Sequence, residues 1–559
     1  MKTIKNIIKS TLCIAAIGAS GMMATSCNDL LDTAPNGVLS ENEVGPEQAV
    51  QLMTAAYATL MNHFVGNNES FAGPINNWIF DVRSDDALKG GGALSMEEGI
   101  NQLEMGIINN DTQPVAFKWS NNYFSISRCN TAIRAIEASP SIEEDLKKSM
   151  VGEMKTLRAY YYFDLYRLYK KFPYFDETVL DPSSVSASEY TRAQIIGFIQ
   201  QDLRDAYKVL PETQTEVGRF NKYVAAGILA KVDLFNSDWS EAAEYAGYII
   251  SSGKYGLFEN FLDISKPEFN NLQESVMAVQ FSSANSPDQY NYNNCLNCTW
   301  SEGNLYGNGD DFYLASQNLV NAFRTDAAGL PYLDNEPADS DVLSADYPGN
   351  VDPRLDFTVG RIGMPWRSYP YNEHWCRALD LYGQYSGKKP YPSPDSPYVE
   401  KGIVPWGASS LNYMIIRYAD VLLMRAEALI EMGGDLEEAR RLINQVRSRA
   451  SKSVNPAYEP VDIDPSVANY SISEYPATGW NQAYARKAVR MERRLELAME
   501  GHRWFDLVRW GEVVDVMNRY YQSEAKFHEY YKNASPMTED KIYLPVPLDQ
   551  AQNAGGLYD

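Results

Sequence analysis

The chain has 559 residues, with 49 lysines and arginines against 73 aspartates and glutamates, so its formal net charge is −24 at pH 7. Nucleic acids need a basic surface, and attachment to an anionic membrane by charge alone needs basic clusters, so this acidic balance disfavours both kinds of partner. A chain of this length buries a large core and needs no disulfide to fold.

The first 27 residues have the layout of a secretory signal peptide. Three lysines lie within residues 2–9, an apolar run covers about residues 11–24, and the segment ends in Ala24-Thr25-Ser26-Cys27. The run is too short for a spanning helix, which needs about 20 apolar residues. The small residues before Cys27 resemble a bacterial lipobox, whose cysteine is lipidated. We therefore expect a signal peptide over 1–26, lipid on Cys27 and a spacer over 27–45; an ordinary signal peptide with a chance cysteine is the alternative.

The first half of the chain has helical periodicity interrupted by turn residues. Ser141 and Glu144 have the spacing of a capping box and predict the start of a long helix. Helices in sequence-adjacent pairs favour an array of αα-hairpins over a βαβ sheet. The pairs resemble tetratricopeptide units in length, although no strict period is present. The predicted helices cover residues 46–62, 117–138, 141–169, 191–209, 221–236 and 238–251.

The middle of the chain, residues 254–412, is rich in Pro, Gly, Asn, Asp and aromatic residues and has little helical period. A strand is predicted at Ser275–Phe281. Loops this long are usually functional. Helices return at 413–432, 436–450 with Asp435 as N-cap, 481–500 and 502–520, separated by a second insert at 451–478 and followed by an extended segment at 542–547.

Two segments carry a family signal: 415–427 (IIRYADVLLMRAE) and 491–510 (MERRLELAMEGHRWFDLVRW). With the lipobox, the helix pairs and the shorter matches at Asp352-Pro353-Arg354-Leu355-Asp356, 157–169 and 435–450, they closely resemble the SusD/RagB family over nearly the whole mature chain. The tail departs slightly: Leu544-Pro545-Val546-Pro547 matches the family's ending, and the residues after it only approximate the rest.

The resemblance implies a mainly α fold of about four tetratricopeptide-like helix pairs, with the ligand site in loop-rich insertions. It assigns residues 46–253 and 413–520 to the helical core and 254–412 to the ligand-binding insertion of one domain over 46–559. Family members are outer-membrane lipoproteins of Bacteroidetes that bind glycans at the cell surface. They cover a SusC-like TonB-dependent transporter as a lid. Members similar to RagB handle peptides, and this alternative stays open.

The ligand site is expected in three loops, 76–92, 285–313 and 366–385. A neutral sugar offers CH faces to aromatic rings and hydroxyls to polar side chains. Family binding aromatics fall in loops resembling the first two. Trp300 is the first choice, because it lies deep in a polar, Gly-rich loop; for each candidate, packing in the core is the competing interpretation. The candidates are Trp300, Tyr306, Tyr290, Tyr292, Trp78, Arg83, Asp85, Asp86, Lys89, Trp366, Tyr371 and Trp375.

No catalytic residue is predicted. The arginines and glutamates of 492–503 have i,i+3 and i,i+4 spacings and are expected to form structural ion pairs. A surface glycoside hydrolase is the rival class, and would need two carboxylates about 5–10 Å apart across a cleft. The sequence has no nucleophile elbow, H-E-x-x-H or P-loop.

Neither a cofactor nor a metal is predicted. Asn308-Gly309-Asp310-Asp311 could offer oxygens to calcium but lacks the EF-hand spacing. Cys295 and Cys298 have half the spacing of a zinc site, and without a second C-x-x-C a disulfide or two separate thiols is preferred. The tryptophans in helical patterns are expected to pack in the core: Trp119, Trp239, Trp504 and Trp510.

Overall fold

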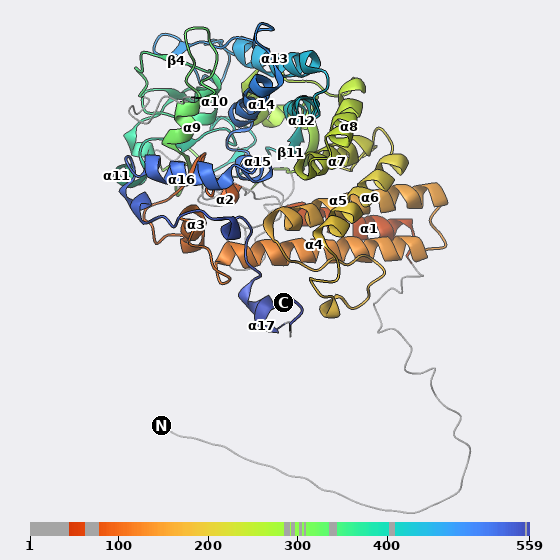
Figure 1. Ribbon diagram of the computed structural model, residues 1–559. Helices are drawn as coiled ribbons and strands as arrows, with labels where there is room; N and C mark the ends of the chain where they lie inside the picture. The colour runs from red at the N-terminus through yellow and green to blue at the C-terminus, as the bar shows by residue number, and fades with distance from the viewer. Residues whose placement is uncertain are drawn as a thin grey trace, which may run out of the picture.

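The structure is a computed structural model, and it describes most of the mature chain. The described residues are 44–61, 78–283, 291, 297–300, 305–306, 309–334, 344–401, 408–553 and 556–558. The predicted signal peptide, Cys27 and nearly all of the predicted spacer lie outside them. The fold is mainly α, as predicted (Figure 1).

The helices of the first half form antiparallel neighbours in chain order. α4 packs against α5, α5 against α6, α6 against α7 and α7 against α8, while α1 packs on α4. Figure 1 shows α1, α4, α5 and α6 side by side. The bounds are α1 Pro46–Tyr57, α4 Gln113–Ala138, α5 Glu144–Leu168, α6 Arg192–Val209, α7 Lys222–Asn236 and α8 Trp239–Ser251.

Two of these helices, α6 and α7, begin at a residue whose side chain caps the helix. Thr191 accepts a hydrogen bond from the backbone N–H of Gln194 in a complete capping box at α6. The predicted capping role of Ser141 is wrong, because α5 begins two residues later than a Ser141 cap would place it and no side chain caps it. The Ser141 hydroxyl lies instead 3.2 Å from that of Ser139.

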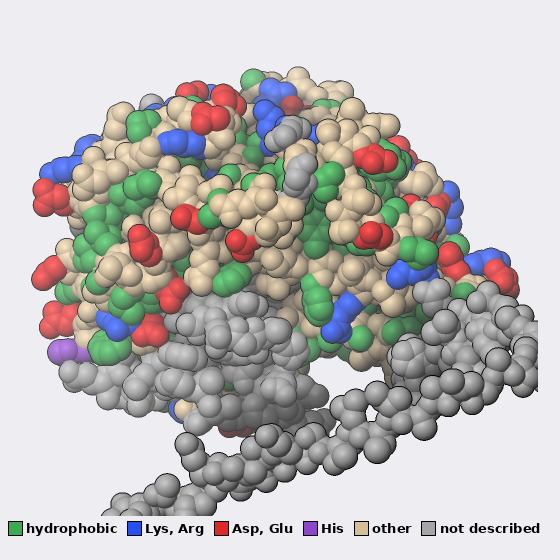
Figure 2. Space-filling view, turned by 90° about the horizontal axis from the view of Figure 1, so that it is seen from below, with side chains coloured by type: hydrophobic (Ala, Val, Ile, Leu, Met, Phe, Trp, Pro, Cys, Tyr) green, Lys and Arg blue, Asp and Glu red, His purple; other side chains and the backbone are tan. Residues whose placement is uncertain are grey.

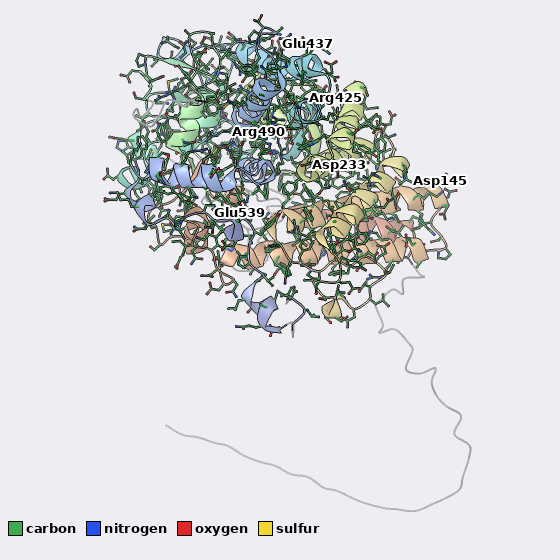
Figure 3. All side chains as sticks on the ribbon, in the orientation of Figure 1. Asp145, Asp233, Arg425, Glu437, Arg490 and Glu539 are labelled. Atoms are coloured by element: carbon green, nitrogen blue, oxygen red, sulfur yellow. The ribbon has the colours of Figure 1, made fainter. Side chains whose placement is uncertain are left out.

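The second helical group continues the array, because α12 (Tyr418–Glu431) packs on α8 as well as on α13 (Leu436–Lys452) and α14 (Gln482–Leu497). Arg425, labelled in Figure 3, joins three of these helices. Its Nε donates to Glu438 on α13 at 2.6 Å, and its Nη1 donates to the carbonyl oxygen of Ala243 on α8 at 2.6 Å.

Two predicted helices differ from the structure. Residues 413–417 form strand β11 (Tyr413–Arg417), which pairs antiparallel with β2 (Ser275–Val279), so the helix predicted over 413–432 begins only at Tyr418. The helix predicted over 502–520 is two helices, α15 (Arg503–Trp510) and α16 (Val513–Glu524). They break at Gly511, whose φ of 71° is left-handed and ends α15.

The remaining described elements are short, and every sheet among them has two strands. β1 pairs antiparallel with β3. The strand predicted at Ser275–Phe281 is confirmed, because residues 275–279 form β2. The other bounds are α2 Trp78–Asp81, β1 Ala87–Gly90, α3 Glu98–Glu104, β3 Phe312–Ala315, α9 Gln317–Ala322, β4 Asn350–Val351, α10 Arg354–Thr358, β5 Val359–Gly360, β6 Pro365–Trp366, β7 Tyr369–Pro370, α11 Leu379–Tyr382, β8 Ser386–Gly387, β9 Val399–Glu400, β10 Ala408–Ser409, β12 Asn469–Tyr470 and α17 Leu548–Asn553, with short 3₁₀ helices at 58–60, 182–184, 261–265, 267–269, 373–375, 529–533 and 539–541.

Buried ion pairs join the helical core to the short elements. Glu496 on α14 accepts from Arg417 Nη1 at 2.6 Å and from Arg354 Nη1 at 3.0 Å. Glu492 accepts from the same Arg354 at 2.7 Å and from Arg447 at 2.9 Å. The structural role predicted for this segment is confirmed, but the partners come from distant elements rather than from the i,i+3 and i,i+4 neighbours.

The predicted core tryptophans are packed as expected: Trp119 and Trp504 are buried, and Trp239 and Trp510 are partly buried against the main core. Within the described part of the chain, no helix combines the length and apolarity that crossing a bilayer would require.

Candidate functional site

Trp300 is a large aromatic side chain that the structure leaves in contact with solvent. It is 40% exposed. The guanidinium carbon of Arg377 lies 4.7 Å from the centre of its ring, a cation–π contact. Arg377 is itself fixed, because its side chain pairs with Asp310 and its backbone N–H donates to Asp311 Oδ2 at 2.8 Å. The Trp300 ring is therefore in contact with a guanidinium group whose own position is fixed by Asp310 and Asp311.

The loop that carries Trp300 is fixed by its close approach to residues 309–311. The backbone N–H of Asp311 donates to the carbonyl oxygen of Cys298 at 2.9 Å. A Cβ at Gly309 would lie 1.9 Å from the same oxygen, so only glycine fits there. Gly309, one of the glycines of this Gly-rich loop, therefore allows a tight backbone contact.

Cys298, two residues before Trp300, belongs to a buried cluster of aromatic residues. Trp366 Nε1 donates to the Tyr306 hydroxyl at 3.0 Å, and that hydroxyl donates to the carbonyl oxygen of Pro392 at 2.8 Å. The Trp366 and Tyr371 rings stack at 5.5 Å. The aromatic cluster consists of Cys298, Tyr306, Trp366, Tyr371, Trp375 and Tyr391.

The prediction that Tyr306, Trp366, Tyr371 and Trp375 contact a ligand is therefore wrong for the structure as described, because all four are buried in the aromatic cluster. Burial raises the pKa of Tyr371 well above its usual value, which keeps the phenol neutral as a hydrogen-bond donor. Tyr290 and Tyr292 lie outside the described residues.

The polar candidates of the first loop are also buried. Asp85 accepts from Arg503 Nε at 2.7 Å, and Asp86 accepts from Arg494 Nε at 2.8 Å. Lys89 donates to the carbonyl oxygens of residues 93 and 96 at 2.8 and 2.6 Å. Burial acts to raise the pKa of Asp85, but Arg494 and Arg503 outweigh it and hold this pKa well below its usual value.

The prediction that these four residues form the rim of a ligand site is thus wrong, because each is buried and donates or accepts hydrogen bonds within the protein. The four residues are Arg83, Asp85, Asp86 and Lys89. Arg83 lies against the ring of Trp504, at 3.9 Å from its centre. Trp78 begins α2, and its side chain lies outside the described residues.

The two carboxylates beside Trp300 are occupied by donors from the chain. Asp310 pairs with Arg377, while Asp311 accepts from the Ser386 hydroxyl at 3.1 Å and from the Arg377 backbone. Burial raises the pKa of Asp311 to about 7. Among the described residues, no group of three or more His, Cys, Asp or Glu side chains is placed to hold a metal. Asn308 and Cys295 lie outside the described residues.

Arg377 is the site residue that the sequence analysis missed. It follows Trp375 directly after Cys376 in the third candidate loop, and a cation next to aromatic residues in a loop was the available signal. Charge is otherwise dispersed: acidic and basic side chains are scattered over the described part of the face in Figure 2. Grooves elsewhere on the molecule, such as one of about 480 Å³ lined by Arg219, Lys254 and Tyr255, have no tryptophan in their lining.

Comparison with known protein families identifies the family to which the chain belongs. A profile of the SusD family matches residues 273–559. The chain belongs to the SusD family. A second profile, described as starch-binding and associating with the outer membrane, matches residues 51–234, so the family assignment draws on both halves and supports association with the outer membrane.

Individual relatives match over nearly their full length. SusD-like protein P38 of Formosa agariphila is 26% identical over 92% of this chain and 94% of its own. A SusD-like carbohydrate binding protein from Bacteroides fragilis superposes with a TM-score of 0.72 at 20% identity, over 93% of this chain and 99% of its own. Surface glycan-binding protein A from Bacteroides thetaiotaomicron, solved with laminarihexaose, gives a TM-score of 0.69 at 19% identity, over 92% of this chain and 99% of its own. These structures establish the fold.

Proposed function

We propose that this SusD family protein is a cell-surface lipoprotein that binds an oligo- or polysaccharide and passes it, without catalysis, to a SusC-like TonB-dependent transporter. Residues 46–559 would act as one binding domain, held through the spacer 27–45 by lipid on Cys27. The observation that carries the proposal is Trp300, an exposed ring braced by Arg377.

The geometry suits a neutral or weakly charged sugar. One face of the Trp300 ring is occupied by the Arg377 guanidinium, which leaves the other for the CH face of a sugar ring. Arg377 is paired with Asp310, so its charge is compensated and no net charge is offered to the ligand. One related structure is of a laminarin-binding protein and another was solved with laminarihexaose, and both ligands belong to this chemical class.

Affinity gel electrophoresis tests the binding claim. The protein without residues 1–27 is run through gels containing a panel of neutral and acidic polysaccharides, with mixed oligopeptides in competition. We expect retardation by at least one glycan and no competition by peptides. Competition by peptides with no retardation in any glycan gel would replace the proposal with the RagB-like peptide lid.

The non-catalytic part of the proposal has its own support and test. Asp310 and Asp311, beside Trp300, are both engaged by donors of the chain, and neither is free to act as an acid–base pair. Incubation of pure protein with each retained polysaccharide should release no new reducing ends. Reducing ends that accumulate with time would make it a surface glycoside hydrolase.

Transport partnership and surface display are tested in cells. A protein tagged at its C-terminus should co-purify with one TonB-dependent transporter and be digested when intact cells are treated with protease. Protection from protease on intact cells, with digestion after lysis, would place it on the inner leaflet and contradict the proposal.

A further inference from the structure

Arg83 carries a charge in the interior without a carboxylate beside it. Its side chain is 1% exposed. Its Nη2 donates to the carbonyl oxygen of Lys541 at 2.8 Å, while its Nε and Nη1 have no hydrogen-bond partner among the described residues. Other buried arginines have one: Arg158 pairs with Asp202 at 2.8 Å, and Arg354 with a carboxylate at 2.7 Å.

Two further buried donors without a protein partner lie on the residues around Arg83. The Trp504 ring lies under the guanidinium, 3.9 Å from its carbon, and the indole Nε1 has no acceptor in the part of the chain that the structure describes. The Tyr521 hydroxyl also has none, and it interacts electrostatically with Arg83. Three interacting side chains thus keep buried N–H or O–H donors without a partner among the described residues. The carboxylate of Glu104 interacts electrostatically with Tyr521, whereas the groups that interact with Arg83 are the hydroxyls of Tyr521 and Tyr169.

A negative charge beside the buried guanidinium of Arg83 would stabilise the folded protein. Burial lowers the pKa of Arg83 to about 9, so the guanidinium is still charged at pH 7. An unpaired buried charge costs several kcal/mol, and backbone carbonyl oxygens compensate only part of it. An anion that accepts several hydrogen bonds and donates none matches the available donors.

We infer that Arg83, Trp504 and Tyr521 bind a monovalent anion of the halide type in the protein interior. Because Arg83 is 1% exposed, the ion is enclosed on folding, which favours a single-atom anion over a polyatomic one. The site joins three parts of the chain: the segment after α2, the α15–α16 pair and residues 541–542 of the C-terminal segment. Bound halide would therefore stabilise the fold whether or not a glycan is bound.

Thermal unfolding at constant ionic strength tests the inference on the wild-type protein. Sodium gluconate is replaced stepwise by sodium chloride or bromide, because gluconate is too large for an enclosed site. We expect the Tm to rise and saturate, by about 2–3 °C at a hundredfold excess over the Kd. A Tm that does not respond to halide would overturn the inference and leave water at these donors.

Bromide also locates the ion directly. A crystal grown in bromide should give an anomalous difference peak within hydrogen-bond distance of Arg83 and the Trp504 indole nitrogen. A map with surface bromide peaks but none beside Arg83 would contradict the site even if the Tm responded.

Variants separate this site from halide effects on the surface. Tyr521→Phe keeps the fold's volume and removes one donor, so it should require several-fold more chloride for the same rise in Tm. Arg83→Met should abolish the rise. Arg519→Met, which removes an exposed arginine on the same helix as Tyr521, is the matched control and should leave it unchanged. If Arg83→Met does not fold, Tyr521→Phe and the bromide map decide whether the site exists. The inference is refuted if Tyr521→Phe keeps the wild-type Tm response to chloride and the anomalous difference map has no peak beside Arg83.

Discussion

Replacing Trp300 by alanine removes the exposed ring and little else. A tryptophan buries up to about 250 Å² when fully covered, and 40% of this side chain is exposed, which leaves about 100 Å² for a ligand to cover. At about 25 cal/mol per Å², complete coverage contributes about 2.5 kcal/mol, or about 70-fold in Kd. The remaining part of the ring, about 150 Å², contacts the protein, so by the same coefficient the variant should also lose about 3 °C in Tm while remaining folded at the assay temperature.

Isothermal titration calorimetry with the glycan retained most strongly in the gel panel measures the change, and circular dichroism melting measures stability. Tyr248→Ala is the matched control, because that ring is 38% exposed on α8, in the helical array. Glycan binding unchanged in Trp300→Ala would refute the assignment of the site. A fall in Tm much larger than that of Tyr248→Ala would show that the main role of the Trp300 ring is packing.

Three further predictions follow from the same contacts. Gly309→Ala should weaken glycan binding at least tenfold, as measured by calorimetry. The new Cβ would lie 1.9 Å from the Cys298 carbonyl oxygen and would force the Trp300 loop to move. Unchanged affinity would show that the position of this loop does not matter for binding. Burial acts to raise the pKa of Glu500, but Arg417 outweighs this effect and lowers the pKa from its usual 4.5 to about 2. The Glu500 carboxylate therefore contributes about 3 kcal/mol to the free energy of unfolding above pH 4.5, and this contribution is lost as the pH falls toward 2. Glu500→Gln should flatten the dependence of Tm on pH in that window, and parallel profiles would contradict the ion pair. Cys27→Ala should bind glycan in solution and be absent from the membrane fraction on immunoblots, whereas membrane retention would contradict lipid anchoring.

The helices were predictable because their determinants are local. Apolar periodicity and caps such as Asp435, whose side chain accepts from the Glu438 backbone N–H at 2.8 Å, act within a few residues. The strand at 413–417 was not predictable in this way, because its apolar run fits either a strand or the start of a helix. Pairing with β2, far away in sequence, decides for the strand.

The candidate site was predicted only in part, for a related reason. Trp300 and Trp366 both lie in segments without helical periodicity, and only tertiary packing leaves the first 40% exposed and the second fully buried. Asp86 looked like a surface carboxylate beside a glycine-rich turn, yet its partner Arg494 lies 408 positions later in the chain. Composition identifies loops that hold aromatic and polar residues, but it carries no information on which of them face solvent.

The central claim, that Trp300 is the surface on which a glycan binds, is tested most directly by ¹⁹F NMR of protein labelled with 5-fluorotryptophan. The resonance of Trp300 is assigned by its loss in Trp300→Phe. On titration with a glycan retained in the affinity gels, we predict a saturable shift of the Trp300 resonance, while that of the buried Trp504 stays in place. A bound glycan that leaves the Trp300 resonance unmoved and shifts another tryptophan would contradict the account.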